Sequence, residues 1–300
     1  MKKIKLAVPA STSNLGPGFD TLGMALKWPL LLTAEPADRI LLEETTTLAG
    51  PLAQGSRQAL EEVVRAFEKR TGKTACPLKF SFEGDVPPAR GLGSSACCRL
   101  AALSALNLSN NEPLSENELL EVACELEGHT DNAAASQLGG LTVSGWDRGR
   151  IRWIRYPVPE TWRFAALIPD AMLETGRARS VLPTYVPLRQ AVENMQRMAW
   201  LVYALANDRP DLIAGTFHDN LHQPYRKTLL PFLEPVIEAA EEAGAYGAFL
   251  SGSGSAVLAV TDLESGQKVA DAMVERLRKA GEPGYAKLLE PDNRGTRMIE

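Results

Sequence analysis

The sequence predicts an α+β protein built from two domains. Its 300 residues exceed the usual size of a single hydrophobic core, so two domains are the natural expectation. Strand-like segments and turns dominate as far as about residue 155, whereas longer helical patterns follow Trp162. Strands and helices come in mixed order, which favours α+β over a doubly wound parallel sheet. We therefore place the two domains at residues 1–160 and 161–300.

In the first half, apolar strands are expected at residues 4–8 and 78–82. The helices predicted there cover residues 57–70, 94–107 and 115–127. The last of them has a clear start, because Ser115 and Glu118 form the Ser-x-x-Glu pattern of a capping box. It continues with an apolar stripe formed by Leu119, Val122, Ala123 and Leu126.

The second half begins with a strand at residues 164–168. The helices predicted after it cover residues 187–206, 210–218, 232–243 and 265–280. Two strand-like segments flank a glycine-serine loop at residues 251–255, and a short strand is expected at residues 284–289. The sequence contains no internal repeat, low-complexity tract or long linker.

The most informative segment is residues 87–96, Pro-Pro-Ala-Arg-Gly-Leu-Gly-Ser-Ser-Ala, where a loop turns into a helix. A helix that begins at Ser94 or Ser95 turns its unpaired N–H groups and its positive dipole end toward the loop. Gly91 and Gly93 let a large anion approach the backbone, so a phosphate chain is the expected ligand. The Gly-Lys-Ser/Thr ending of a P-loop is absent, and residues 83–90 separate these glycines from the preceding strand, unlike in a dinucleotide fold.

Three further motifs accompany this loop. Residues 9–20 read Pro-Ala-Ser-Thr-Ser-Asn-Leu-Gly-Pro-Gly-Phe-Asp and directly follow the first apolar strand. Residues 125–132 read Glu-Leu-Glu-Gly-His-Thr-Asp-Asn, and Gly139 and Gly140 come soon after them. Residues 247–256 read Gly-Ala-Phe-Leu-Ser-Gly-Ser-Gly-Ser-Ala.

In this order the four motifs resemble the GHMP kinase superfamily, named for galactokinase, homoserine kinase, mevalonate kinase and phosphomevalonate kinase. The first motif, and the ending Asp-Asn-Arg-Gly-Thr-Arg at residues 292–297, resemble homoserine kinases in particular. The resemblance runs from Val8 to Arg297. It implies a ribosomal-S5-like N-terminal domain that binds ATP and a ferredoxin-like C-terminal domain, with the active site between them.

The reaction that this resemblance implies is phosphoryl transfer from ATP to the side-chain hydroxyl of L-homoserine, giving O-phospho-L-homoserine for threonine biosynthesis. Such a transfer needs alignment and neutralisation of developing charge more than covalent chemistry from the protein. The residues expected to bind the nucleotide are Pro88, Arg90, Gly91, Leu92, Gly93, Ser94, Ser95 and Ala96.

The resemblance also implies Mg²⁺ as a cofactor. Because Mg²⁺ prefers oxygen ligands and keeps several waters, one carboxylate and one hydroxyl suffice on the protein side. Ser95 or Ser94 is expected to supply the hydroxyl. Glu125 is favoured as the carboxylate, with Glu127 as the alternative, since helical phase does not separate the two.

The implied acceptor is a zwitterion that ends in a hydroxyl group. Its carboxylate calls for arginine, whose guanidinium pairs bidentately, and Arg179 and Arg226 match the family's pattern. By the same resemblance, Asp20 and Asn14 would hold the ammonium group.

Three polar residues follow the helix at 115–127. Asp131 and Asn132 are predicted to position the reacting hydroxyl, with Asp131 as the candidate base. His129 is expected to contact the substrate rather than to transfer protons.

The composition limits the kinds of binding partner and the cellular location that we expect. A net charge of −5 without a clustered basic stripe argues against a nucleic-acid surface. No stretch approaches the roughly twenty apolar residues of a membrane helix, and Pro9 makes the apolar patch after Lys5 too short for a signal peptide. The four cysteines lack zinc-site spacing and are expected to pack as small hydrophobes. We expect a cytoplasmic protein and, from the resemblance, a homodimer.

Two alternative functions stay open at this point. The chain could be another small-molecule kinase of the superfamily, acting on a sugar, mevalonate or shikimate. It could also be a catalytically silent sensor that binds a nucleotide or an amino acid on the same fold. The anion loop and the acidic residues are both intact, which counts against a sensor.

Overall fold

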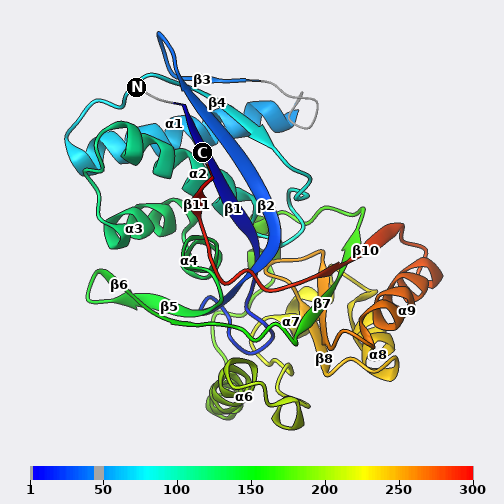
Figure 1. The fold of residues 1–300 in the computed structure, drawn as a ribbon. Coiled ribbons are helices and arrows are strands. Elements are labelled where there is room, and N and C mark those ends of the chain that lie inside the picture. The colour runs from blue at the N-terminus through cyan, green and yellow to red at the C-terminus, as the bar shows by residue number, and fades with distance from the viewer. Residues whose placement is uncertain (1–2, 44–50, 300) are drawn as a thin grey trace.

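The computed structural model describes residues 3–43 and 51–299. The strands among these residues form two sheets. The first sheet has seven strands, in the order β11-β1-β2-β4-β3, with β5 paired to β2 and β6 paired to β5 (Figure 1). Its strands are β1 (Ile4–Ser13), β2 (Leu22–Pro36), β3 (Leu41–Leu42), β4 (Leu78–Glu83), β5 (Leu141–Asp147), β6 (Arg150–Tyr156) and β11 (Arg297–Met298).

Four helices pack on one face of this sheet through a shared hydrophobic core. They are α1 (Pro51–Thr71), α2 (Ser94–Ser109), α3 (Glu116–Glu127) and α4 (Asp131–Leu138). Side chains alternate across a strand, so every second residue of β1 and of β4 turns toward these helices. The strand residues concerned are Ile4, Leu6, Val8, Leu78, Phe80 and Phe82.

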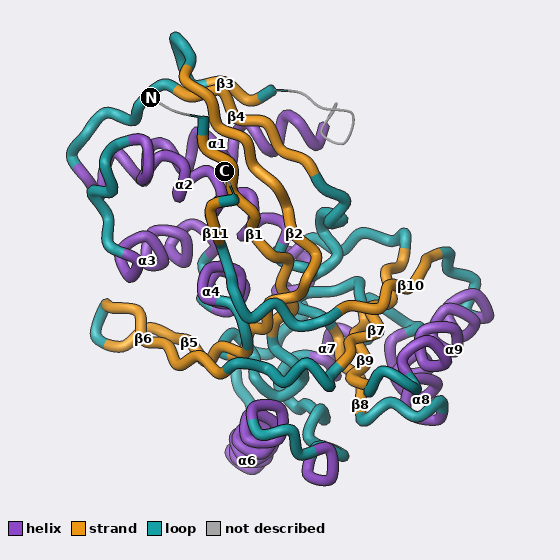
Figure 2. Tube along the Cα trace, in the orientation of Figure 1, coloured by secondary structure: helices purple, strands orange, loops and turns teal. Residues whose placement is uncertain are grey.

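The second sheet confirms the ferredoxin-like expectation. Its four antiparallel strands lie in the order β10-β7-β9-β8, and the chain runs through them as β-α-β-β-α-β. The elements are β7 (Arg163–Pro169), α8 (Leu233–Glu242), β8 (Gly247–Leu250), β9 (Val257–Thr261), α9 (Gly266–Lys279) and β10 (Gly284–Leu289). Figure 2 shows α8 and α9 next to each other along this sheet.

β7 joins the two halves of the molecule, because its two faces belong to different cores. Ala165 and Leu167 pack under α8 and α9. Phe164, Ala166 and Ile168 instead share a core with the start of β2 and with α6 (Leu188–Ala206). The second sheet is therefore buried on both faces, and the loops at its end are held against the first domain.

The helices and strands predicted from the sequence are present, except for one helix. A helix was predicted at residues 210–218, but this stretch forms only the 3-10 turn Pro210–Leu212. Gly215 interrupts any continuation, since its φ of 73° lies in the left-handed region. Three short helices were not predicted: α4, α5 (Thr175–Ser180) and α7 (Gln223–Arg226).

The end of the chain does not stay in the second domain. β11 pairs antiparallel with β1, and Pro291 forms a bridge with Leu26 of β2. The predicted division at residue 160 therefore does not hold for β11, because Arg297 and Met298 pair with the first sheet. Within the described ranges, no helix combines the length and the apolar character needed to cross a membrane.

Asp292 shapes this returning segment and is only 2% exposed. Its Oδ1 accepts hydrogen bonds from the backbone N–H groups of Arg294 (2.8 Å) and Gly295 (3.1 Å). Its Oδ2 accepts one from Nη1 of Arg297 at 3.1 Å. These contacts turn the chain so that β11 can reach β1.

We predict that Asp292→Ala lowers the free energy of unfolding by about 1–3 kcal/mol, because two backbone donors lose their acceptor. Urea unfolding followed by circular dichroism measures the change. Asp271→Ala is the matched control, since this exposed aspartate accepts one hydrogen bond from Gln267 on a helix surface. An equal effect of the two substitutions would contradict the role assigned to Asp292.

Candidate active site

Three loops from distant parts of the sequence meet between the two domains. The first comprises the end of β1 from Ser11 onward and the turn into β2, the second leads from β4 into α2, and the third joins β8 to β9. The backbone N–H of Ser11 donates to Leu92 O (3.2 Å), and that of Gly252 donates to Ser13 O (3.1 Å). The hydroxyl of Ser251 donates to Gly91 O at 2.6 Å. Each loop is therefore hydrogen-bonded to the other two.

Gly91 and Gly93 allow this close approach. Both have a positive φ, 73° and 68°, in the left-handed region that disfavours other residues. A Cβ on Gly91 would lie 1.9 Å from the carbonyl oxygen of Ser251, and one on Gly93 would lie 2.2 Å from the Ser11 hydroxyl. The glycines thus serve loop–loop packing as well as access to the backbone.

A cavity of about 490 Å³ lies over these loops. At one end it is apolar, with Leu30, Ala59, Phe82, Val86 and Cys98 in its lining. The glycine loop and the first turn of α2 form its middle. Its other end is polar and charged, with the residues Asn14, Asp20, His129, Asp131, Arg179 and Arg226.

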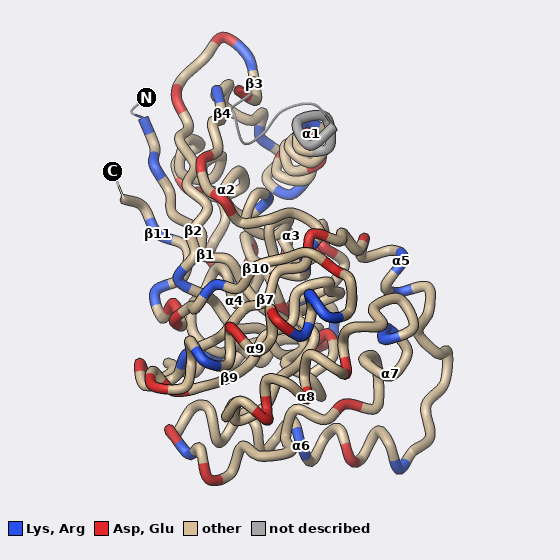
Figure 3. The backbone as a smooth tube through the Cα atoms, turned by 90° about the vertical axis from the view of Figure 1, so that its right-hand side faces the viewer, with Lys and Arg blue, Asp and Glu red and all other residues tan. Residues whose placement is uncertain are grey.

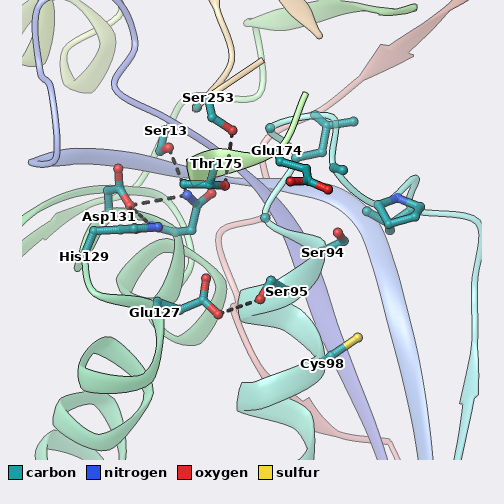
Figure 4. Close-up of a pocket in the computed structure, with 18 of the residues that line it drawn as sticks. Ser13, Ser94, Ser95, Cys98, Glu127, His129, Asp131, Glu174, Thr175 and Ser253 are labelled. Carbon is teal, nitrogen blue, oxygen red and sulfur yellow. Dashed lines mark hydrogen bonds and ion pairs between the residues drawn. The ribbon is translucent and has the colours of Figure 1, made fainter. Parts of the chain in front are cut away.

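The middle of the cavity offers an anion site. α2 begins at Ser94, and Gly93 caps it without a side-chain hydrogen bond. The first N–H groups of a helix have no intrahelical acceptor, and with the helix dipole they attract negative charge. Ser94 and Ser95 stand in this first turn and line the cavity (Figure 4).

Glu127 meets α2 at the anion site. The hydroxyl of Ser95 donates a 2.8 Å hydrogen bond to Glu127 Oε1, and Figure 4 shows the two side chains pointing toward each other. Arg99 donates to the same oxygen. The Glu127 side chain is 7% exposed, whereas that of Glu125 is 57% exposed and pairs with Arg70 instead.

A second acidic group lies deeper in the pocket. Asp131 is 2% exposed, and its Oδ1 lies 2.6 Å from Nδ1 of His129 and accepts from the backbone N–H of Asn132 at 2.7 Å. Burial raises the pKa of Asp131, but the hydrogen bond and charge of His129 outweigh it and leave the pKa below its usual value. Burial opposes protonation of His129, yet Asp131 raises the pKa of this imidazole overall.

Asn132 connects this group to the first loop. Its Nδ2 donates to the Ser13 hydroxyl at 2.9 Å, and its Oδ1 accepts from the Ser11 hydroxyl at 3.0 Å. Both ends of the amide are thereby fixed, so its orientation is set by the loop rather than by a ligand.

Two arginines and one aspartate form the charged end. Arg179 pairs bidentately with Asp20, at 3.0 Å and 2.8 Å. Arg226 is 2% exposed, and burial together with the nearby charge of Arg179 lowers its pKa to about 10. The side chain of Asn14 accepts from the backbone N–H of Asp20 (3.0 Å) and donates to Gly252 O (2.9 Å).

Comparison with known proteins identifies the family. The model for the N-terminal domain of GHMP kinases matches residues 58–140, and the model for their C-terminal domain matches residues 198–279. The homoserine kinase of Carboxydothermus hydrogenoformans is 39% identical over 96% of this chain and 94% of its own length. The homoserine kinase of Moorella thermoacetica is 39% identical over 97% and 98%. The chain belongs to the homoserine kinase family of the GHMP kinases.

A solved structure agrees with this assignment. The crystal structure of the homoserine kinase from Cytophaga hutchinsonii superposes with a TM-score of 0.87 at 25% sequence identity. The match covers 100% of this chain and 98% of the other. The two-domain GHMP kinase fold inferred from the motifs is thus confirmed.

Most of the residues predicted from the family motifs line the cavity, and three do not. Arg90 turns away and donates to the carbonyl oxygens of Pro88, Pro169 and Asp170, so it fastens the loop to the end of β7. Ala96 belongs to the first turn of α2, and its side chain is buried. Glu125 lies outside the cavity, where it faces Arg70 and solvent. The carboxylate that accepts the hydrogen bond from Ser95 is that of Glu127.

Several lining residues were not predicted. Those at the apolar end, Leu30, Ala59, Phe82 and Val86, come from separate elements and form no local motif. Glu174, Thr175 and Ser253 also line the cavity (Figure 4). Cys98 also lines the cavity, and burial together with the charge of Glu127 raises the pKa of its thiol to about 12.

Proposed function

We propose that this protein transfers the γ-phosphoryl group of ATP to the side-chain hydroxyl of L-homoserine. The observation that carries the proposal is one cavity that joins an anion site at a helix N-terminus to a seat with two arginines and one aspartate. The first part suits a phosphate chain. The second part suits the carboxylate and ammonium groups of an amino acid.

The nucleotide is proposed to lie along the glycine loop. Its phosphates would accept hydrogen bonds from the first-turn N–H groups of Ser94, Ser95 and Ala96. Its base and ribose would occupy the apolar end, where Phe82 and Val86 offer van der Waals surface. This orientation directs the terminal phosphate toward Asp131 and Asn132.

We propose Glu127 and Ser95 as the protein ligands of Mg²⁺. Their oxygens are adjacent, and the described residues contain no cluster of three or more His, Cys, Asp or Glu side chains. That fits Mg²⁺, which usually takes one or two carboxylates and completes its shell with water and substrate phosphates. When bound, the ion neutralises charge on the phosphates.

The acceptor is proposed to bind with its carboxylate on Arg179 and Arg226 and its ammonium group on Asp20. Its hydroxyl would then lie beside Asn132 and Asp131. The lowered pKa of Asp131 makes it a weak proton acceptor. We therefore assign Asp131 and Asn132 a positioning role, which a loose transition state permits because deprotonation need not precede transfer.

We expect ADP release in the presence of ATP, Mg²⁺ and L-homoserine, and little with mevalonate, shikimate or galactose. The charged end supplies partners for both the carboxylate and the ammonium group of an amino-acid zwitterion. Mevalonate, shikimate and galactose are not zwitterions. A coupled assay with each acceptor in turn measures the difference. Turnover with one of the other acceptors would contradict the assigned substrate, and ATP binding without any turnover would favour a sensor.

Glu127→Gln should lower kcat by about 100-fold or more, because it removes the carboxylate proposed to hold the metal at the phosphates. Glu125→Gln is the matched control two residues away and should leave kcat within about twofold, since its carboxylate is exposed. Steady-state kinetics over a range of Mg²⁺ concentrations separates the two. A large loss with Glu125→Gln alone would return the metal site to that residue.

We propose that the protein works in the cytoplasm as a homodimer. All four cysteines are free, as is usual in a reducing compartment. The exposed face of α6 carries Leu188, Val192, Met195, Trp200 and Tyr203, of which Leu188 is 81% exposed and Trp200 57%. Figures 1 and 3 place this helix at the edge of the molecule.

This apolar face suits a second copy of the chain. Its residues recur at helical spacing from Leu188 to Tyr203, so two antiparallel copies about a two-fold axis would bring Leu188 opposite Tyr203. With aromatic side chains burying about 150–250 Å² each, the face offers area on the order of 500 Å² per chain. An apolar patch of this extent on a protein surface commonly marks an interface.

Met195→Glu should convert the dimer to a monomer, because it places a charge at the centre of the proposed contact. Sedimentation equilibrium gives the mass of each form. Leu263→Glu, which changes an exposed leucine in the turn between β9 and α9, is the control. A monomeric wild type at micromolar concentration would rule the interface out.

A further inference from the structure

His222 stands behind the charged end of the cavity and is completely buried. It precedes α7, on which Arg226 lies one turn later. Neither the sequence motifs nor the proposed reaction gives it a role. Its surroundings nevertheless define its state, because both ring nitrogens have a polar neighbour.

The hydrogen-bond pattern fixes one neutral tautomer. Nε2 of His222 lies 2.9 Å from the carbonyl oxygen of Gly16, which can only accept, so Nε2 carries the proton. Nδ1 lies 3.1 Å from Nη1 of Arg226, which can only donate, so Nδ1 must be unprotonated. A protonated imidazole would set two donors against each other at this contact.

The charges around the ring support the neutral form. Burial is the largest influence on the pKa of His222 and lowers it, and Arg226 acts in the same direction. Asp219, 3.4 Å from Nε2, and Asp20 act in the opposite direction but do not prevail. Asp219 is also occupied by the backbone N–H groups of Leu221, His222 and Gln223 and by the side chain of Asn194.

Arg226 is held on three sides by these contacts. Its Nη1 donates to His222 and, at 2.8 Å, to Gly252 O, and its Nε donates to Ala178 O at 3.3 Å. Within residues 3–43 and 51–299, Nη2 has no hydrogen-bond partner in the protein. Because Arg226 lines the cavity, Nη2 is the group left to meet a ligand.

Phe19 completes the support. Its ring stacks on His222 with centroids 5.4 Å apart. The guanidinium carbons of Arg226 and Arg179 lie 5.4 Å and 5.7 Å from the same ring centroid. One aromatic ring therefore holds the imidazole and both cations in a fixed relation, with each cation near its electron-rich system.

We infer that His222, held as the neutral Nε2–H tautomer against Phe19, is a positioning residue that aims Nη2 of Arg226 at the carboxylate of the acceptor. The inference rests on the proposed function for the identity of the acceptor. Its consequence is selective: His222 governs acceptor binding and leaves the nucleotide end of the cavity unaffected.

Nitrogen NMR of the full chain with ¹⁵N-labelled histidine tests the tautomer without any assay of turnover. The chain has three histidines, and the signal that vanishes in His222→Leu belongs to His222. We expect a protonated Nε2 and an unprotonated Nδ1 at about pH 6.5, where an unperturbed imidazole is half protonated. A protonated ring or an Nδ1–H tautomer at that pH would overturn the inference.

Kinetics of three variants tests the selectivity. His222→Leu should raise the KM for L-homoserine by about tenfold or more and leave the KM for ATP within about twofold, because only the acceptor seat loses a charged hydrogen bond. His222→Asn should recover much of the loss, since its amide oxygen can accept from Nη1 of Arg226. His218→Leu, which changes an exposed histidine four residues away, should behave as wild type.

Each unexpected result of these experiments leads to a different conclusion. An unchanged acceptor KM in His222→Leu, or an equal rise in both KM values, would refute the positioning role. An Asn variant no better than the Leu variant would also refute it, since packing alone would then explain the loss. If the wild type does not phosphorylate L-homoserine, the proposed function fails, while the NMR result still decides the state of His222.

Discussion

The structure depends on the direct contact of three loop backbones. Gly91 approaches the carbonyl of Ser251 so closely that no side chain fits between them. Hydrogen bonds from Ser11 and Gly252 then join the loops in pairs. One loop comes from each of three distant segments, and the third belongs to the second domain. The contact therefore sets both the relation of the domains and the position of the first turn of α2 in the cavity.

The charged end of the cavity brings like charges together. Arg179 and Arg226 both lie near the ring of Phe19, and Asp20 pairs with Arg179. A protonated His222 would add a third positive charge in a buried place. Keeping this imidazole neutral confines the positive charge beside Phe19 to the two arginines, which suits the carboxylate of a zwitterion, and the Asp20 carboxylate, although paired with Arg179, keeps lone pairs that can accept from its ammonium group.

Much of the fold could be predicted from local patterns. The capping box of Ser115 and Glu118 forms as expected, and α2, α6, α8 and α9 begin and end within two residues of the predicted ranges. The failures are of another kind. The helix expected around Gly215 is absent because a positive φ interrupts it, and β11 joins the first sheet through a pairing of residues 290 positions apart. Sequence periodicity carries no information on such a long-range pairing.

By itself, the sequence determined the family and the order of the domains, and it predicted an anion site, since these follow from motifs that are continuous in the chain. Tertiary structure decided which side chains line the cavity. Glu125 and Glu127 stand on the same helix, and only the packing of α3 against α2 brings Glu127 to Ser95. Arg90 lies within the loop motif, yet its guanidinium binds carbonyls at the end of β7. Side-chain direction depends on neighbours that are remote in sequence, so no local pattern could fix it.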